Sequence, residues 1–222
     1  MNSIILQISG SSRQNKEVVE SDAFQKYNKA LTFIKNKENE LAEKSLKELL
    51  LHPYFNFDDD TFSAADFFND PAVKLLTSIY KNLGKVHENT SNYDDALECY
   101  LEAVSSDKTD ITTWYNIANV AIKKVNYTLA CDSLKECLNI NPSFWPSIDT
   151  LICLLYALGD YISCLHLIQH SLSLNTSFQR ALCVKAQIEE EDPFLFKNFS
   201  WKQGLADLKP SDSATDKEME YP

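Results

Sequence analysis

The sequence predicts an all-α fold in which one pair of helices is repeated along the chain. A pattern of apolar and small residues with a 34-residue period occurs three times without an inserted residue, over residues 77–110, 111–144 and 145–178. The 222 residues include only 4 Gly and 7 Pro, which is too few turn-forming residues for a fold of many short strands. One such helix pair cannot bury its apolar face alone, so we expect the pairs to stack into an array.

Four places in each window define the repeat, when Thr77 is counted as place 1. Place 17 holds a tyrosine, place 20 a small residue, place 24 a large residue, and place 8 a residue that is small in the first two windows. In chain order these residues are Gly84, Tyr93, Ala96 and Tyr100; Ala118, Tyr127, Ala130 and Leu134; and Ile152, Tyr161, Cys164 and Ile168. This pattern is typical of the tetratricopeptide repeat (TPR), in which a helix A is followed by an antiparallel helix B.

We therefore predict a right-handed TPR superhelix of about four helix pairs plus a capping helix. Gly84 is expected to face Ala96, so that the two helices approach closely. A degenerate first repeat has Asn39 at place 17. The aromatic residues after Pro193 are expected to fold back onto the last helix. The predicted organisation is a disordered leader (1–20), a TPR domain (21–192) with repeats 23–56, 77–110, 111–144 and 145–178 and a capping helix 179–190, and a mostly disordered tail (193–222).

An acidic and aromatic insert over residues 52–71 interrupts the register between the first two repeats. Two interpretations are open: its phenylalanines cover the junction between the repeats, or the insert is a clasp that holds a basic partner. The clasp residues would be Asp58, Asp59, Asp60, Phe62, Phe67 and Phe68. Asp70 and Pro71 then predict the N-cap and first residue of a helix that extends to about Asn89.

Partners are expected on the inward faces of helices A, which line the concave groove of a TPR superhelix. The groove residues that we expect to contact a partner are Lys81, Lys85, Tyr115, Asn116, Asn119, Asp149 and Tyr156. Lys81, Asn116 and Asn119 could form half of a clamp for the terminal carboxylate of a peptide. Pro146 and Thr150 stand where the other half needs Lys and Arg, so we expect the groove to bind some other kind of segment.

Composition and motifs argue against several classes of function. The formal net charge of −11 disfavours nucleic acid as a direct ligand. It suits a basic partner or solubility alone, and for charge by itself we favour solubility. No apolar run of 18 residues predicts a membrane span. The chain has no P-loop, G-x-S-x-G, GxGxxG or H-E-x-x-H motif, so we expect neither catalysis nor a cofactor. Its start lacks the features of a secretory signal, which leaves the cytosol or the nucleus.

The cysteines and histidines show no metal-binding pattern. None of the six cysteines belongs to a CxxC motif, and we expect them to be reduced thiols. His166 and His170 are four residues apart and close to Cys164, but they occupy outward places of a helix B and have no third ligand. We expect both histidines at the surface. Asp58–Asp60 lack the spacing of a calcium-binding loop.

Two stretches carry a more specific resemblance. YKNLGKVHENTSNYDDALECYLEAVSSDKTDITTWYNIANVAI and NPSFWPSIDTLICLLYALGDYISCLHLI resemble the N-terminal repeats of the calcineurin-binding protein cabin family and of its fungal counterpart in the HIR complex. The likeness covers about Ser21 to Pro193. Its specific marks are Trp114-Tyr115 and the run that begins Phe144-Trp145-Pro146.

The resemblance implies a non-catalytic nuclear scaffold in a HIR-type histone-chaperone complex, which assembles nucleosomes outside replication. Its partners would be other subunits of that complex, and histones through the acidic surface. Family members also restrain calcineurin, but the portion responsible lies far toward their C-terminus and nothing in residues 194–222 resembles it. We therefore expect an N-terminal piece, a short isoform or an incomplete gene model. The resemblance implies a link to calcineurin regulation for the family, and supports it less for this short chain than the scaffold role. The alternative is a generic TPR adaptor or co-chaperone that binds a peptide C-terminus.

Overall fold

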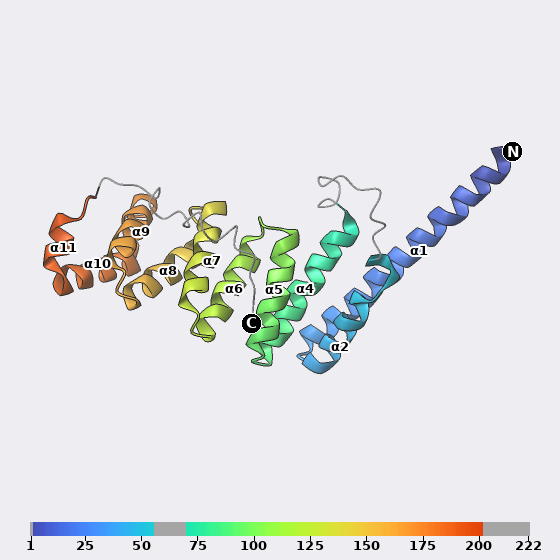
Figure 1. The fold of residues 1–222 in the computed structure, drawn as a ribbon, viewed down its shortest axis with the longest axis horizontal. Coiled ribbons are helices and arrows are strands. Elements are labelled where there is room, and N and C mark those ends of the chain that lie inside the picture. The colour runs from blue at the N-terminus through green and yellow to red at the C-terminus, as the bar shows by residue number, and fades with distance from the viewer. Residues whose placement is uncertain (1, 56–69, 202–222) are drawn as a thin grey trace. The chain divides into compact units, whose positions relative to one another are not determined.

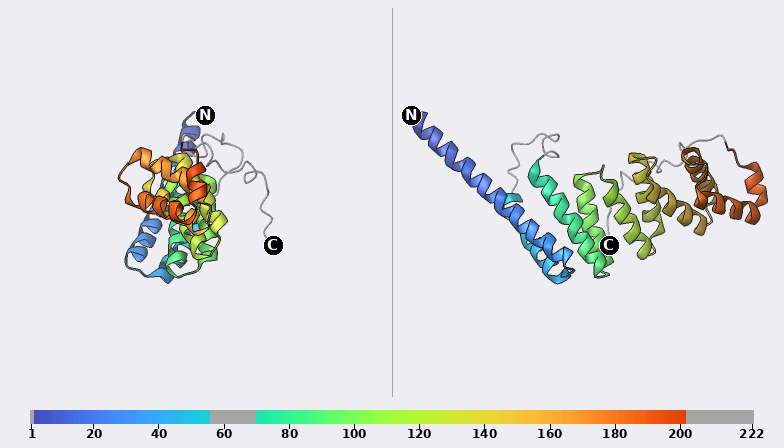
Figure 2. Two further views of the ribbon diagram at one scale, coloured as in Figure 1. Left: turned by 90° about the vertical axis from the view of Figure 1, so that its left-hand side faces the viewer. Right: turned by 180° about the vertical axis from the view of Figure 1, so that it is seen from behind.

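A computed structural model of the chain describes residues 2–55 and 70–201, with side chains described from residue 17 onward. Every regular element in these two ranges is a helix, as predicted (Figure 1). No helix there is long and apolar enough to span a bilayer. The chain divides into two compact units, Met1–Thr113 and Trp114–Pro222, and each is built from antiparallel helix pairs (Figure 2).

The first unit contains two helix pairs and the beginning of a third helix A. Within each pair the two helices pack along one another. The elements are α1 (Asn2–Lys35), α2 (Asn39–Leu50), a short 3₁₀ turn η1 (Pro53–Phe55), α4 (Pro71–Asn89), α5 (Tyr93–Ser106) and the start of α6 (Ile111–Lys123). Asp70 caps α4 through a 2.7 Å hydrogen bond from the Ala72 N–H, with Pro71 at the first helical position, as predicted.

The second unit continues the same alternation. It contains the rest of α6, then α7 (Tyr127–Ile140), α8 (Trp145–Ala157), α9 (Tyr161–Leu174), α10 (Gln179–Glu191) and α11 (Pro193–Asn198). The tyrosine at place 17 begins helix B in both units. Before each helix B, place 15 has a positive φ, and only one of the four residues is glycine: Lys37 (62°), Ser91 (61°), Val125 (62°) and Gly159 (74°). The tight turn between the two helices therefore imposes the left-handed backbone at this place, largely whatever the residue.

The start of the first helix differs from the sequence-based expectation. α1 begins at Asn2, whereas a disordered leader was expected over residues 1–20 and a helix from Ser21. Residues 2–35 contain no proline and a single glycine. No residue in this segment therefore interrupts a helix that runs into the packed part of α1. The predicted clasp residues (Asp58, Asp59, Asp60, Phe62, Phe67 and Phe68) lie outside the described residues.

Gly84 is buried, and the atoms nearest to it belong to the ring of Tyr100. A Cβ atom added at Gly84 would lie 2.8 Å from Cε1 of Tyr100 and 2.9 Å from Cδ1. The Tyr100 side chain is fully buried, so the ring has no free space into which it could move. In this repeat Gly84 and Tyr100 therefore share one volume, and the tyrosine at place 24 requires the small residue at place 8.

An aromatic segment that follows α11 packs against α9 and α10, the last long helices of the second unit. Phe199 packs on His166 with ring centroids 4.7 Å apart, and Trp201 packs on Phe199 at 4.9 Å. The Lys185 ammonium lies 4.4 Å above the Trp201 ring. The prediction that these aromatics fold back is confirmed. The expectation of a surface position for His166 is wrong: its side chain is only 8% exposed, because this later segment covers it.

The aromatic segment is held by the cap of α11, which gives a testable prediction. The Asp192 carboxylate accepts a 2.9 Å hydrogen bond from the Leu195 N–H. Asp192→Ala should lower the free energy of unfolding by about 1 kcal/mol, as the loss of an N-cap does. Urea unfolding followed by tryptophan fluorescence measures this. Glu190→Ala, at an exposed neighbour, is the control and should change little. Equal effects of the two substitutions would contradict the capping role.

Candidate protein-binding site

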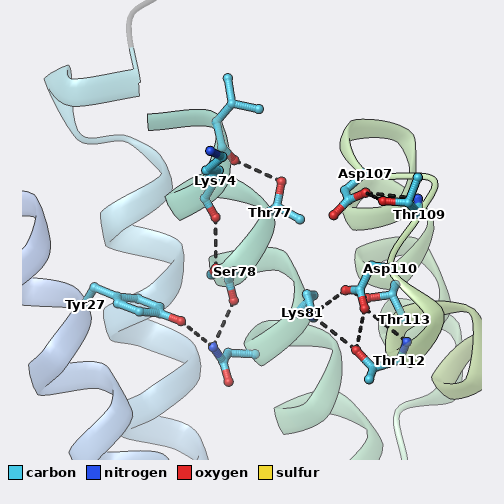
Figure 3. Close-up of polar contacts among 12 residues, drawn as sticks. Tyr27, Lys74, Thr77, Ser78, Lys81, Asp107, Thr109, Asp110, Thr112 and Thr113 are labelled. Carbon is cyan, nitrogen blue, oxygen red and sulfur yellow. Dashed lines mark hydrogen bonds and ion pairs between the residues drawn. The ribbon is translucent and has the colours of Figure 1, made fainter. Parts of the chain in front are cut away.

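A pocket of about 660 Å³ lies in the first unit, between α4 and the turn that joins α5 to α6. Figure 3 shows the polar contacts of residues around it. It includes the predicted groove residue Lys81. The helix α4 contributes Val73, Lys74, Thr77, Ser78 and Lys81, and the turn contributes residues 105–110. The hydroxyl groups of Thr77 and Ser78 donate 2.9 Å hydrogen bonds to the carbonyls of Val73 and Lys74, so both donors are already used within α4.

Lys81 is engaged inside the protein. Its ammonium forms an ion pair with Asp110 and lies 3.4 Å from Oγ1 of Thr112. The Asp110 carboxylate also accepts hydrogen bonds from the Thr112 N–H at 3.0 Å and from the Thr113 hydroxyl at 2.7 Å. Burial by itself would raise the pKa of Asp110, but the hydrogen bonds from Lys81, Thr112 and Thr113 outweigh it and lower the pKa to about 2. The Asp110 carboxyl group therefore stays ionised at neutral pH and neutralises the charge of Lys81.

The other predicted lysine of the groove is also paired. The ammonium of Lys85 lies 2.9 Å from Oε2 of Glu88, three residues later in α4. On the same helix, the Asn82 amide donates a 2.7 Å hydrogen bond to the hydroxyl of Tyr27 in α1 (Figure 3). The inward face of α4 is thus occupied by contacts to the chain itself.

The groove residues of the second unit form similar contacts between successive helices A. The Tyr115 hydroxyl of α6 lies 3.3 Å from the Thr150 hydroxyl of α8, and its ring packs edge-on against Phe144 at 5.7 Å. Asp149 of α8 accepts hydrogen bonds of 2.9 Å and 3.5 Å from the guanidinium of Arg180 in α10. This two-point pairing joins α8 to α10.

Tyr156 takes part in a different arrangement at the end of α8. The hydroxyls of Tyr156 and Tyr161 each donate a 2.5 Å hydrogen bond to one oxygen of the Glu191 carboxylate, and the two rings are stacked 5.8 Å apart. The hydrogen bond to Glu191 raises the pKa of Tyr156 to about 12, and the two tyrosines lower the pKa of Glu191. Tyr156 therefore positions the end of α10.

One rule connects these contacts: in the four helices A that are followed by another, the side chain at place 5 bonds to the next helix A or to the residue just before it. We call these contacts rungs. They are Tyr27–Asn82, Lys81–Asp110, Tyr115–Thr150 and Asp149–Arg180. Sequence reasoning identified Lys81, Tyr115 and Asp149 as inward-facing but assigned them to a partner. The opposite charges at the two ends of Lys81–Asp110 and Asp149–Arg180 were the signal that could have identified these two rungs.

Asn116 and Asn119 differ from the other predicted groove residues. Both side chains are half-buried on α6, and no hydrogen bond to either amide is present among the described residues. Neither amide is among the fully buried polar atoms without a partner, so solvent reaches both. Within the same described ranges, no three His, Cys, Asp or Glu side chains are grouped as a metal site.

Comparison with known proteins establishes the family. Residues 20–193 match the family described as the CABIN1 N-terminal domain, which confirms the resemblance inferred from the sequence. The chain belongs to this family. Over 223 aligned residues it is 26% identical to calcineurin-binding protein 1 of Arabidopsis thaliana, a match that covers 92% of this chain. The chain spans only 12% of the length of that relative.

Solved structures confirm the fold of the CABIN1 N-terminal domain as TPR. A tetratricopeptide repeat protein from Parabacteroides merdae superposes with a TM-score of 0.62 at 21% identity, covering 76% of this chain and 59% of its own. MamA superposes with a TM-score of 0.58 at 16% identity, covering 76% of this chain and 82% of its own. At such identities the likeness concerns the fold alone. A right-handed superhelix stays a prediction from the repeat class.

Proposed function

We propose that this CABIN1 N-terminal domain is a non-catalytic scaffold that joins subunits of a HIR-type histone-chaperone complex in the nucleus, for nucleosome assembly outside replication. The observation that carries the proposal is the family match over residues 20–193, which coincides with an array of TPR helix pairs. TPR arrays present extended surfaces to partner proteins, and their helix pairs are generally non-catalytic.

The surface charge supports a basic partner. Three exposed acidic side chains, Asp94, Glu98 and Glu102, follow one another at four-residue spacing on α5 and so share one face of the helix. The chain as a whole carries a net charge of −11. Such a surface attracts histones and other basic proteins more strongly than it attracts acidic ones.

The alternative function, a co-chaperone that binds a peptide C-terminus, has less support. A terminal carboxylate needs cationic side chains that are available to it. Lys81 is neutralised by Asp110 and Lys85 by Glu88, so a carboxylate would first have to displace a protein carboxylate. The Arabidopsis relative is named for calcineurin binding, but calcineurin is not part of our proposal because this chain spans 12% of that protein.

Cross-linking mass spectrometry in nuclei tests the proposed function. The tagged chain presents exposed lysines in both units, such as Lys44, Lys123 and Lys197, to an amine-reactive cross-linker. We expect reproducible cross-links from these lysines to subunits of a histone-chaperone complex, and none in cells that express the tag alone. Absence of the chain from nuclei, or cross-links to other proteins only, would rule the proposal out.

A further inference from the structure

Exposed apolar side chains gather where the helices A of the second unit end. They stand on three successive repeats: Val125 after α6, Leu158 and Ile162 after α8, and Phe194 after α10. Val125 and Leu158 line one hollow of the surface, and Ile162 and Phe194 line another. The two hollows adjoin, because Leu158 and Ile162 belong to the same turn. We call this continuous patch the turn edge, and none of the predicted groove residues belongs to it.

Two residues of the turn edge are unfavourable for the chain alone. Val125 has a φ of 62°, a backbone conformation that a β-branched residue rarely adopts, and its side chain is 65% exposed. Ile162 stands in the first turn of α9, where the helix dipole favours an acidic residue. The equivalent places of the first unit hold polar residues, which are Lys37 and Ser91 for Val125, and Glu40 and Asp94 for Ile162. Strained and exposed apolar residues that the fold does not require indicate a contact outside the chain.

The charges along the turn edge change sign from one end to the other. Places 13 and 14 of the three repeats hold, in order, Lys123 and Lys124, Ala157 and Leu158, and Glu191 and Asp192. Asp192 is half-buried and the other five are exposed. Hydrogen bonds from Tyr156 and Tyr161 lower the pKa of Glu191, so its carboxyl group is ionised at neutral pH. The edge is thus basic at the end of α6, apolar in the middle and acidic at the end of α10.

A second copy of the same edge matches this order when it is turned by a two-fold rotation. With the axis at the turn between α8 and α9, Leu158 meets Leu158 of the second copy, and the basic end of each copy faces the acidic end of the other. Gly159 has no side chain and the space around it is open, which lets the two middle turns approach closely. A partner with only one sign of charge would be repelled at one end of the edge. The charge order therefore favours a second copy as the occupant.

We propose that two copies of the chain associate through their turn edges in an antiparallel, two-fold symmetric contact. The apolar side chains form its centre, and the opposite charges at the two ends fix its orientation. The inference is independent of the proposed nuclear function, since it rests on residues of the second unit alone. Pairing gives one assembly two copies of every other surface of the chain.

Sedimentation velocity of the full chain over a range of concentrations tests the association. We expect a reversible monomer–dimer equilibrium whose Kd rises with added salt, because salt screens the charged ends but not the apolar centre. Leu158→Ser/Ile162→Ser should raise the Kd at least about 10-fold, since it removes two apolar side chains from each copy. Leu174→Ser is the matched control. Leu174 is exposed nearly as much as Leu158 (45% and 47%) but lies at the other end of α9, so the Kd should not change.

Cysteine cross-linking tests the orientation of the two copies. Each new cysteine is introduced into the full chain with the exposed Cys183 replaced by serine, and the protein is oxidised with copper phenanthroline. Leu158→Cys, close to the axis, should form a disulfide with its own copy. Val125→Cys and Phe194→Cys should each form little dimer alone. A mixture of these two variants should form a disulfide dimer, because opposite ends of the edge meet. Far-UV circular dichroism checks that every variant is folded.

Any of three results would contradict the inference. The chain could stay monomeric at every concentration, Leu158→Ser/Ile162→Ser could associate as tightly as the unaltered chain, or Val125→Cys could cross-link to itself as readily as to Phe194→Cys. The first two would leave the turn edge to a different protein, and the third would exclude the antiparallel contact. None of them bears on the nuclear cross-links, so failure of this inference stays distinguishable from failure of the proposed function.

Discussion

Gly84→Leu should lower the free energy of unfolding of the first unit by about 3 kcal/mol, the upper part of the range for overpacking a core. The reason is the closeness of Tyr100, whose ring carbons lie 2.8–3.1 Å from the position that a Cβ atom would take. Leucine favours helix formation over glycine by up to about 1 kcal/mol, which offsets only a part of the clash. Urea unfolding followed by far-UV circular dichroism measures the change.

A second substitution separates the clash from other effects of leucine at this position. Tyr100→Ala alone should cost about 3–5 kcal/mol because it opens a cavity in the core. Combined with Gly84→Leu it should cost less than the sum, since the leucine side chain fills part of the vacated space. Ala186→Leu is the control, because Ala186 stands at the same place of the last helix A but is exposed. If the effects of Gly84→Leu and Tyr100→Ala on the free energy of unfolding were strictly additive, the two side chains would not share one volume.

Asp110→Ala should destabilise the first unit by about 2–3 kcal/mol at neutral pH. The substitution removes the hydrogen bond that caps α6 and leaves the ammonium of Lys81, whose side chain is 33% exposed, without its carboxylate. Asp107→Ala is the matched control. Its carboxylate accepts bonds from Thr109 in the same turn but is exposed, so we expect a loss of less than about 1 kcal/mol.

The destabilisation by Asp110→Ala should also depend on pH in a defined direction. The pKa of Asp110 is about 2 in the folded protein, against an ordinary value of 3.8. The folded state therefore binds this proton less readily than the unfolded state, and the associated stability is present above pH 3.8 and disappears as the pH falls toward 2. The difference between the unaltered chain and the variant should shrink by at most about 2 kcal/mol over this range. A difference that is constant between pH 5 and pH 2 would contradict this account.

The regular part of the fold follows from local sequence. Each helix B begins at place 17, which is Asn39 in the first pair and a tyrosine in the others; Tyr93, Tyr127 and Tyr161 were identified from the period alone. Helix starts depend on capping and apolar spacing within a few residues, which the sequence displays directly. The helix α4 was predicted for the same reason, from Asp70 and Pro71.

The candidate site was predicted only in part. The period identified Lys81, Tyr115, Asn116 and Asp149 as inward-facing, because the face of a helix follows from residue spacing. It did not identify their partners. Thr150 and Arg180 lie in the next helix A and Asp110 directly precedes it, and each contact depends on the distance between neighbouring helices and on side-chain rotamers. Only with the partners known do Asn116 and Asn119 stand out from the rest.

By itself, the sequence determined the repeated helix pair, the starts of its helices, the inward faces and the CABIN1 family. Tertiary structure alone decided that Tyr100 fills the space at Gly84, that Phe199 covers His166, and that place 5 links successive helices A. The physical reason is the range of the interactions. Helix formation and capping act over a few residues, whereas burial and ion pairing act between residues that come together only when the repeats stack.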